Sequence, residues 1–265
     1  MIRRIDRHAA LAMVNGIARM SARARERIIP ALKSQLDFSI SAQPTETTCG
    51  PTCLHAVYKY FEDSISQEQV IEEVDALGEG GTLAVYLACH ALRRGYSAKI
   101  YTYNLQVFDP TWFASRDIDL SAKLRAQMDA KPDAKMQHAI MGYLEFLRLG
   151  GELLFRDLTA KLIREPLKRS RPIITGLSAT YLYRSMREIG ATNTEDDIRG
   201  TPVGHFVVLC GYDKTEREVL VADPMIPNPY SKTQIYPESI ERVLGAIFLG
   251  VVTYDANLLV IDKSV

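Results

Sequence analysis

The spacing of apolar residues along this chain changes near Pro172. Before that point, most apolar residues recur at intervals of three and four, which predicts amphipathic helices. After it, short runs rich in Val, Ile and Leu are separated by turn-forming residues, which predicts strands. Helices followed by strands are typical of an α+β fold, so we expect N-terminal helices packed on a C-terminal antiparallel β-sheet.

The chain also carries local signals for where these elements begin and end. Ser66 followed by Gln69 has the spacing of a capping box, and Gly95 stands at a helix C-cap position. The predicted helices are one or two within 5–35 with a break at Pro30, one of about 14 residues from Cys49, Ser66–Leu77, Leu83–Arg94, Lys123–Met128 and Met136–Leu149. The predicted strands are Ser97–Tyr103, Ile173–Leu177, His205–Tyr212, Val219–Ala222, Ala246–Tyr254 and Leu258–Ile261.

Length and composition limit the organisation of the chain. With 265 residues, 47% hydrophobic and 24% charged, the chain has the composition of a soluble globular protein and can bury a large core. We expect a helical arm at 1–35 and a main domain at 36–265, with a mainly helical insertion at about 104–168. The 32 basic and 32 acidic residues balance, so nucleic acid is not an expected partner.

Charge is uneven only at the N-terminus. Residues 1–33 hold eight Lys or Arg residues against Asp6 and Glu26. Two interpretations remain open: this basic segment contacts a partner or a membrane surface, or it is a solvated helix face.

The four cysteines, at positions 49, 53, 89 and 210, do not have the spacing of a disulfide scaffold. This favours a reducing compartment and a cytoplasmic location. No run of about 18 apolar residues occurs, so no integral membrane segment is expected.

Cys49 is the strongest candidate for a chemical role. It stands at a predicted helix start, behind the possible N-caps Thr47 and Thr48, where free backbone N–H groups and the helix dipole favour a thiolate. The Cys49 amide and the side-chain amide of Gln43 are candidate donors to an oxyanion. Cys53 is a rival nucleophile, but it lies one helical turn further on, where a buried cysteine behaves as a small hydrophobe.

His205 and Asp223 supply the matching base and orienting group. His205 begins a predicted strand beside a loop, whereas the other histidines lie in helical stretches. A hairpin centred near Thr215 pairs Val207 with Asp223, and His205 is then a diagonal neighbour on the same face. A shift of one residue would move Asp223 to the other face, and Asn228 is the alternative orienter.

These residues resemble a known family. The chain contains Gln43, five residues, then Cys49-Gly50, the turn Gly81-Thr82, the strand-like Gly204-His205-Phe206-Val207-Val208-Leu209, and Asp223-Pro224 after the next strand. This order resembles the bacteriocin-processing peptidases, which are papain-like cysteine enzymes that cut after double-glycine leaders. The resemblance covers about 43–103 and 172–225 and implies a papain-like fold.

The resemblance also implies roles: Cys49 as nucleophile, His205 as base, Asp223 as orienter and Gln43 as oxyanion donor. Thr48 stands where the family commonly has an acidic residue, and no fused transporter is expected, as in stand-alone relatives. The expected activity is a cysteine peptidase or amide hydrolase acting on a peptide or protein, without a cofactor. The alternatives are an acyltransferase or transpeptidase on the same thiol, and a non-catalytic binding protein on the same scaffold.

Three further features could also have a functional role. Cys49, Cys53, Cys89 and His90 are possible zinc ligands, although their spacing fits no standard pattern. The acidic residues Glu195, Asp196 and Asp197 either attract a basic peptide or form a solvated loop. Gly150-Gly151 is either a self-cleavage site or, more simply, a turn that ends a helix.

Overall fold

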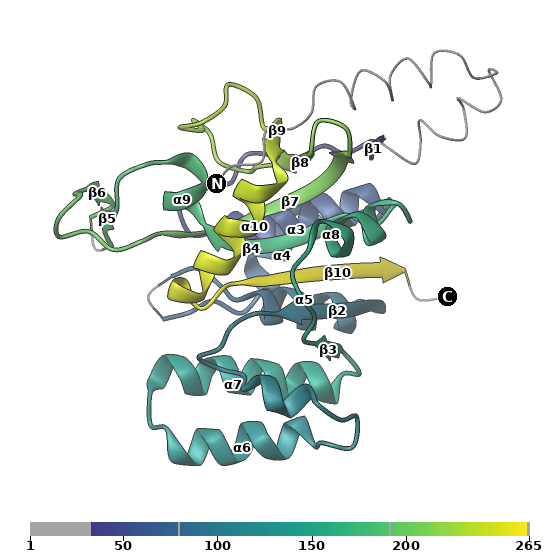
Figure 1. Ribbon diagram of the computed structural model, residues 1–265, viewed down its shortest axis with the longest axis vertical. Coiled ribbons are helices and arrows are strands. Elements are labelled where there is room, and N and C mark those ends of the chain that lie inside the picture. Colours follow the sequence, from purple (N-terminus) through teal and green to yellow (C-terminus); the bar gives the residue numbers. More distant parts are fainter. Residues whose placement is uncertain (1–32, 79, 191, 264–265) are drawn as a thin grey trace, which may run out of the picture.

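The computed structural model of the protein describes residues 33–78, 80–190 and 192–263. Helices cover both faces of a central sheet, with α10 in front of it and α3 and α4 behind it in the view of Figure 1. The helices are α3 (Cys49–Tyr60), α4 (Gln67–Glu73), α5 (Ala84–Arg93), α6 (Leu120–Ala130), α7 (Ala134–Arg148), α8 (Ala160–Leu167), α9 (Ala179–Tyr183) and α10 (Ile240–Leu249), with 3-10 turns η1 (Pro110–Phe113) and η2 (Gly250–Thr253).

The described strands form one large sheet and one small hairpin. The large sheet has the order β3-β2-β10-β4-β7-β8-β9, and β1 pairs with β7. All pairs in it are antiparallel except β2 with β3. The strands are β1 (Lys33–Gln35), β2 (Tyr96–Thr102), β3 (Glu152–Leu154), β4 (Ile173–Ser178), β7 (Gly204–Asp213), β8 (Glu218–Ala222), β9 (Ile235–Ser239) and β10 (Asn257–Lys263), while β5 (Glu188–Ile189) pairs with β6 (Thr194–Glu195). The predicted α+β class is confirmed.

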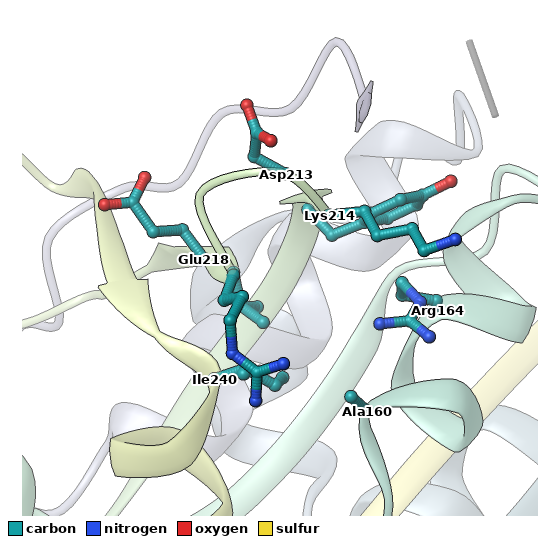
Figure 2. A pocket seen from close by; sticks show the side chains of 9 residues that line it. Ala160, Arg164, Asp213, Lys214, Glu218 and Ile240 are labelled. Atoms are coloured by element: carbon teal, nitrogen blue, oxygen red, sulfur yellow. The ribbon is translucent and has the colours of Figure 1, made fainter. Parts of the chain in front are cut away.

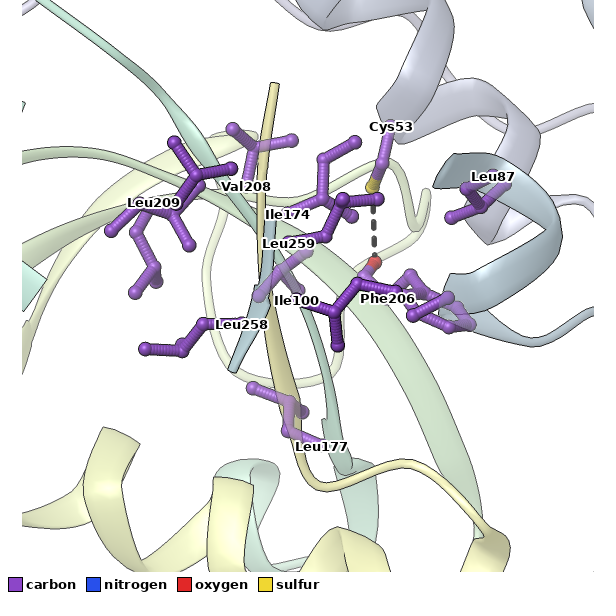
Figure 3. Packing of buried hydrophobic residues seen from close by; sticks show 14 of the residues in the cluster. Cys53, Leu87, Ile100, Ile174, Leu177, Phe206, Val208, Leu209, Leu258 and Leu259 are labelled. Carbon is purple, nitrogen blue, oxygen red and sulfur yellow. Dashed lines mark hydrogen bonds between the residues drawn. The ribbon is translucent and has the colours of Figure 1, made fainter. Parts of the chain in front are cut away.

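The central strands are apolar on both faces because helices cover both. Every residue of β4 is buried, and so are the eight central residues of β7. Figure 3 shows part of this packing, in which Cys53 of α3 and Leu87 of α5 approach the sheet from the same side. A strand covered on both faces has a continuous apolar run instead of alternation, which explains the sequences of β4 and β7.

A β-bulge in β7 sets the register of the β7–β8 hairpin. Near the turn Asp213 pairs with Glu218, but beyond an irregularity at Cys210 the partner of Val208 is Ala222. The extra residue shifts the pairing by one position, because two residues of the bulged strand oppose one of its partner.

The shifted register decides which side of the sheet Asp223 faces. Continued one residue past Val208 and Ala222, it places Asp223 opposite Val207, as the sequence predicts. Without the bulge, Asp223 would lie opposite Val208 and its side chain would leave the face of His205.

Some predicted elements are wrong. The expected strand Ala246–Tyr254 is instead the end of α10 followed by η2. Residues 33–35, at the end of the expected helical arm, form a strand, and the rest of that arm lies outside the described residues. The segment 104–168 is mainly helical as predicted, but its β3 pairs with β2 and extends the large sheet.

Gly150-Gly151 forms the turn that ends α7. Gly150 has a φ of +87°, its N–H donates to Leu147 O, and the Gly151 N–H donates to Phe146 O. These two bonds are those of a Schellman motif, so the glycines have a local structural role. Among the described residues, no helix is long and apolar enough to cross a membrane.

Candidate active site

Cys49 is the first residue of α3 and is half-buried. Thr48 is the N-cap, but its side chain accepts no hydrogen bond from the helix. Its hydroxyl donates instead to Thr45 O at 2.9 Å and accepts from the Thr45 N–H at 3.1 Å. Thr48 therefore does not cap the N–H groups of Cys49 and Gly50, and the third residue of the helix, Pro51, has no N–H.

Gly50 has a packing role at the start of α3. A Cβ at this position would lie 2.7 Å from Thr82 Cγ2 and 3.2 Å from the Phe206 ring. The predicted turn before α5 is present, with Gly80 at φ +91° and Gly81 at φ +78°. The start of α3 therefore packs closely between this turn and β7.

Cys53 lies where a rival nucleophile would be ineffective. It is completely buried, and its thiol donates to Phe206 O at 3.3 Å (Figure 3). Burial, and then the negative charges of Cys49 and Asp223, raise the pKa of the Cys53 thiol well above its usual value. A thiol that resists ionisation is a poor nucleophile, so the geometry favours Cys49.

His205 and Asp223 form a buried pair at the open end of the β7–β8 hairpin, away from its turn. His205 Nε2 lies 2.9 Å from Asp223 Oδ1, and the two side chains are 3% and 0% exposed. His205 stands opposite Leu177 of β4, so its backbone is fixed by the centre of the sheet. The contact through Nε2 leaves Nδ1 as the ring nitrogen available to Cys49.

Asp223 accepts four hydrogen bonds besides that of His205. The Met225 N–H donates to Oδ1 at 3.0 Å. The other oxygen, Oδ2, accepts from Tyr183 OH at 2.7 Å, from Tyr236 OH at 2.9 Å and from Asn228 Nδ2 at 2.9 Å. Asn228, the alternative orienter, therefore holds Asp223 instead of the imidazole.

Sequence reasoning did not find Tyr183 and Tyr236. They come from α9 and β9, which are distant in sequence from Asp223, and nothing in their local sequence distinguishes them from other core tyrosines. Their roles depend on the packing of α9 and β9 around the end of β8, which only the tertiary structure reveals.

The charges of the pair stabilise each other. Burial acts to raise the pKa of Asp223, but the positive charge of His205 and the donated hydrogen bonds outweigh it and hold that pKa below its usual value. Burial acts to lower the pKa of His205, but the charges of Asp223 and Cys49 outweigh it and raise the pKa to about 10. Cys49 is therefore close enough to influence the imidazole, and the site favours an imidazolium.

Gln43 is joined to the same site through its backbone. Its N–H donates to Pro224 O at 2.9 Å, which links the loop before α3 to the residue that follows Asp223. Gln43 Nε2 donates one hydrogen to Thr45 O at 3.0 Å and keeps a second. Its Oε1 is buried without a partner among the described residues.

The alternative zinc cluster is not assembled. Cys89 donates to Gly142 O, whereas Cys53 donates to Phe206 O. His90 lies between Tyr58 OH at 2.8 Å and Glu73 at 3.0 Å. Within residues 33–78, 80–190 and 192–263, no three His, Cys, Asp or Glu side chains are grouped as metal ligands.

In the acidic loop, Asp196 already bonds to other residues of the same loop. Asp196 pairs with Arg199 at 2.6 Å and also accepts from two backbone N–H groups of the loop. Burial, and then the charges of Glu46 and Glu195, raise the pKa of Glu188 in the adjacent hairpin. Negative charge thus lies near the loop before Cys49, but Asp196 already has an internal partner.

Comparison with known proteins gives a family match for part of the chain. Residues 152–245 match the model of the family described as Peptidase_C39 like. The matched segment contains His205 and Asp223 and ends before η2, while Cys49 and Gln43 lie outside it. This match confirms the resemblance to C39-type peptidases in the C-terminal half of the chain. No curated protein matches the sequence.

Several solved structures are similar to this chain at low identity. A putative C39-like peptidase from Bacillus anthracis is 13% identical, with 88% of this chain and 98% of that chain covered and a TM-score of 0.47. Xylellain, a cysteine protease from Xylella fastidiosa, is 12% identical, with 88% and 87% covered and a TM-score of 0.43. The peptidase domain of Streptococcus ComA, a bi-functional ABC transporter, is 14% identical, with 86% and 99% covered and a TM-score of 0.42.

Proposed function

We propose that this chain is a cysteine peptidase that cleaves an amide bond of a peptide with Cys49 as nucleophile. The observation that carries the proposal is the buried contact of 2.9 Å between His205 and Asp223, beside a cysteine at a helix start. A nucleophile, a base and a group that orients the base are the parts of a thiol hydrolase. The C39-like family match over 152–245 supports the same interpretation.

The proposed reaction starts from a thiolate–imidazolium pair, in which the proton of Cys49 Sγ has passed to His205 Nδ1. The thiolate attacks the carbonyl carbon of the scissile amide and forms a C–S bond, and the carbonyl oxygen becomes an oxyanion. His205 then gives its proton to the leaving nitrogen as the C–N bond breaks. Water, deprotonated by His205, attacks the thioester and releases the acid and the thiol.

Asp223 orients His205 and stabilises the imidazolium without taking its proton. The five hydrogen bonds that Asp223 accepts support this role, because they keep the carboxylate ionised and fix its direction. The N–H of Cys49 at the start of α3 and the second N–H of the Gln43 side chain are the proposed oxyanion donors.

The acyl acceptor distinguishes hydrolysis from transfer. The same thioester would yield an acyltransferase or transpeptidase if an amine displaced the thiol. A binding protein on the same scaffold would not need a histidine held by a buried aspartate together with a cysteine at a helix start, so this set of residues favours an enzyme.

The direct test is cleavage of a peptide mixture followed by mass spectrometry. We expect new termini with wild type and none with Cys49→Ala, while Cys89→Ala, which changes a buried cysteine outside the site, retains cleavage. Addition of a primary amine such as glycinamide separates the outcomes: hydrolysis gives free carboxylates, and transfer gives the amide adduct. Equal cleavage by wild type and Cys49→Ala would exclude the proposal.

A further inference from the structure

The loop that carries Gln43 contains no helix or strand, although the proposed reaction requires the Gln43 side chain to be held in place. The loop joins β1 to α3 and consists of residues 36–48. An oxyanion donor is effective only where its N–H group meets the developing charge, and a displacement of about 1 Å can slow a reaction about 100-fold. Contacts with other elements must therefore fix the loop relative to Cys49.

Two backbone contacts attach the loop to the large sheet. Near the start of the loop, the Leu36 N–H donates to Cys210 O at 2.9 Å. Figure 2 shows this end of β7, where Asp213 borders a small cavity. Further along the loop, the Gln43 N–H donates to Pro224 O at 2.9 Å. Both acceptors belong to the β7–β8 hairpin or to the residues that follow it, so these bonds place the loop against the sheet without fixing its distance from α3.

The side chain of Gln67 joins the loop to α3. Gln67 is the first residue of α4, and its Nε2 donates to Ala42 O at 3.0 Å and to Thr52 Oγ1 at 3.2 Å. An amide nitrogen carries two hydrogens, so one side chain can make both bonds. Ala42 directly precedes Gln43, and Thr52 is the fourth residue of α3. Gln67 therefore sets the distance between the proposed oxyanion donor and the helix that begins at Cys49.

The bridge made by Gln67 rests on two packed helices. Thr52 of α3 is completely buried. Val70, one turn after Gln67, is also completely buried, and α4 packs against α3. Among the described residues, no other side chain forms a hydrogen bond with the backbone of residues 39–44. Gln67 is therefore the side chain through which the helices hold this part of the loop.

We propose that Gln67 is a positioning residue of the oxyanion site, which holds Gln43 at a fixed distance from Cys49. This inference rests on the proposed function, in which the Gln43 side chain donates to the oxyanion. The two acceptors of Gln67 belong to the loop and to α3, so Gln67 acts through Gln43 and not on the reacting atoms. Its loss should slow formation of the oxyanion and leave the pair of Cys49 and His205 intact.

Gln67→Met tests the proposal, because Met keeps the length and the helix propensity of Gln but lacks both N–H donors. The matched control is Gln69→Met on the same helix, since the Gln69 side chain donates to Glu73 at 2.7 Å and not to the loop. For a peptide that wild type cleaves, we expect kcat of Gln67→Met to fall about ten-fold with KM nearly unchanged, because the bond to the oxyanion forms only in the transition state. Gln69→Met should retain the kcat of wild type.

Alkylation of Cys49 by iodoacetamide separates positioning from a general disturbance of the site. This displacement requires a thiolate but forms no oxyanion, so Gln67→Met and wild type should react at the same rate. Gln43→Ala should lower kcat about 100-fold. Adding Gln67→Met to Gln43→Ala should cause no further loss, because both substitutions remove the same contact with the oxyanion.

Three results would overturn this inference while cleavage by wild type continued to support the thiol chemistry. They are equal kcat values in Gln67→Met and Gln69→Met, a further loss of about ten-fold in the double variant, and slower alkylation of Gln67→Met than of wild type. Absence of cleavage by wild type would instead overturn the proposed function, and this inference with it.

Discussion

At the scale of single residues, Asp223 is the most constrained group of the site. It is completely buried and accepts hydrogen bonds from one imidazole, one amide, one backbone N–H and two phenols. Burying a carboxylate is expensive unless its lone pairs are satisfied. The surrounding donors offset most of that cost. They also fix the orientation in which the carboxylate contacts the His205 imidazole.

Removing one of these hydrogen-bond donors should lower the rate of peptide cleavage without unfolding the protein. We expect Tyr183→Phe to lower kcat/KM for peptide cleavage about ten-fold, because a hydrogen bond to a charged group is worth about 1.5–3 kcal/mol. The matched control is Tyr181→Phe on the same helix, whose ring is partly exposed and lies over Arg242. Equal activity of Tyr183→Phe and Tyr181→Phe would show that the phenol does not support Asp223.

The charge of the pair should appear in the pH dependence of cleavage. Because the pKa of His205 is raised to about 10, the imidazolium that protonates the leaving nitrogen persists through neutral pH and is lost as pH rises through about 10. Asp223→Asn removes a charge that raises this pKa, so the alkaline limb of the kcat/KM profile should move to lower pH. An alkaline limb at the same pH in both proteins would contradict the assigned pair.

At the scale of secondary-structure elements, the start of α3 depends on close packing at Gly50. A methyl group added at this position would lie 2.7 Å from Thr82 Cγ2. Thr82 cannot easily turn away, because its hydroxyl donates to Asp75 O at 2.7 Å. Gly50→Ala should therefore destabilise the protein by about 1–3 kcal/mol, despite the better helix propensity of Ala. Urea unfolding measures the change.

Gly78→Ala is the control for this substitution, because a Cβ there meets nothing within 4 Å. It should leave the free energy of unfolding nearly unchanged. If Gly50→Ala were as stable as Gly78→Ala, the tight contact among α3, Thr82 and β7 would be wrong.

The elements that position Cys49 and His205 were predictable because their signals are local. The helix start at Cys49, the capping serine at position 66 and the glycine after α5 all appear where the sequence places them. For the register that aligns Asp223 with His205, the sequence predicts the correct pairing but not the bulge that produces it. A hairpin centred near Thr215 gives the right pairing, but the structure reaches it through the bulge at Cys210, which has no evident sequence signal.

The error at 246–254 has a physical explanation. The run is rich in apolar and β-branched residues, and a short apolar run does not distinguish a strand from a buried helix. The helical spacing begins earlier, at Ile240, Val243, Leu244 and Ile247, and Ser239 caps it by accepting from the Arg242 N–H. A window that began at Ser239 would have revealed α10.

At the scale of the whole molecule, a second buried carboxylate affects stability near neutral pH. Asp255 is 6% exposed, and burial raises its pKa to about 7 against the opposing effects of a hydrogen bond from Thr253 and the charges of Lys135 and His205. The unfolded carboxyl ionises near its usual value of 3.8. The folded state therefore binds more protons between pH 3.8 and about 7, and this group makes stability fall as pH rises through that window.

Asp255→Asn removes this ionisation while keeping the shape of the side chain. We expect the variant to be more stable than wild type above pH 7, by at most about 4 kcal/mol, and the difference to vanish below pH 4. Thermal unfolding across pH 4 to 9 measures the effect. A difference that stays constant with pH would mean that Asp255 does not ionise in this window.

The central claim is that Cys49 is an activated nucleophile, and intact-mass analysis after incubation with a general cysteine-protease warhead at neutral pH tests it most directly. Wild type and Cys53→Ala should each gain the mass of one warhead, and Cys49→Ala should gain none, because the remaining cysteines among the described residues are buried. Absence of labelling in wild type, or labelling that persists in Cys49→Ala, would contradict the account.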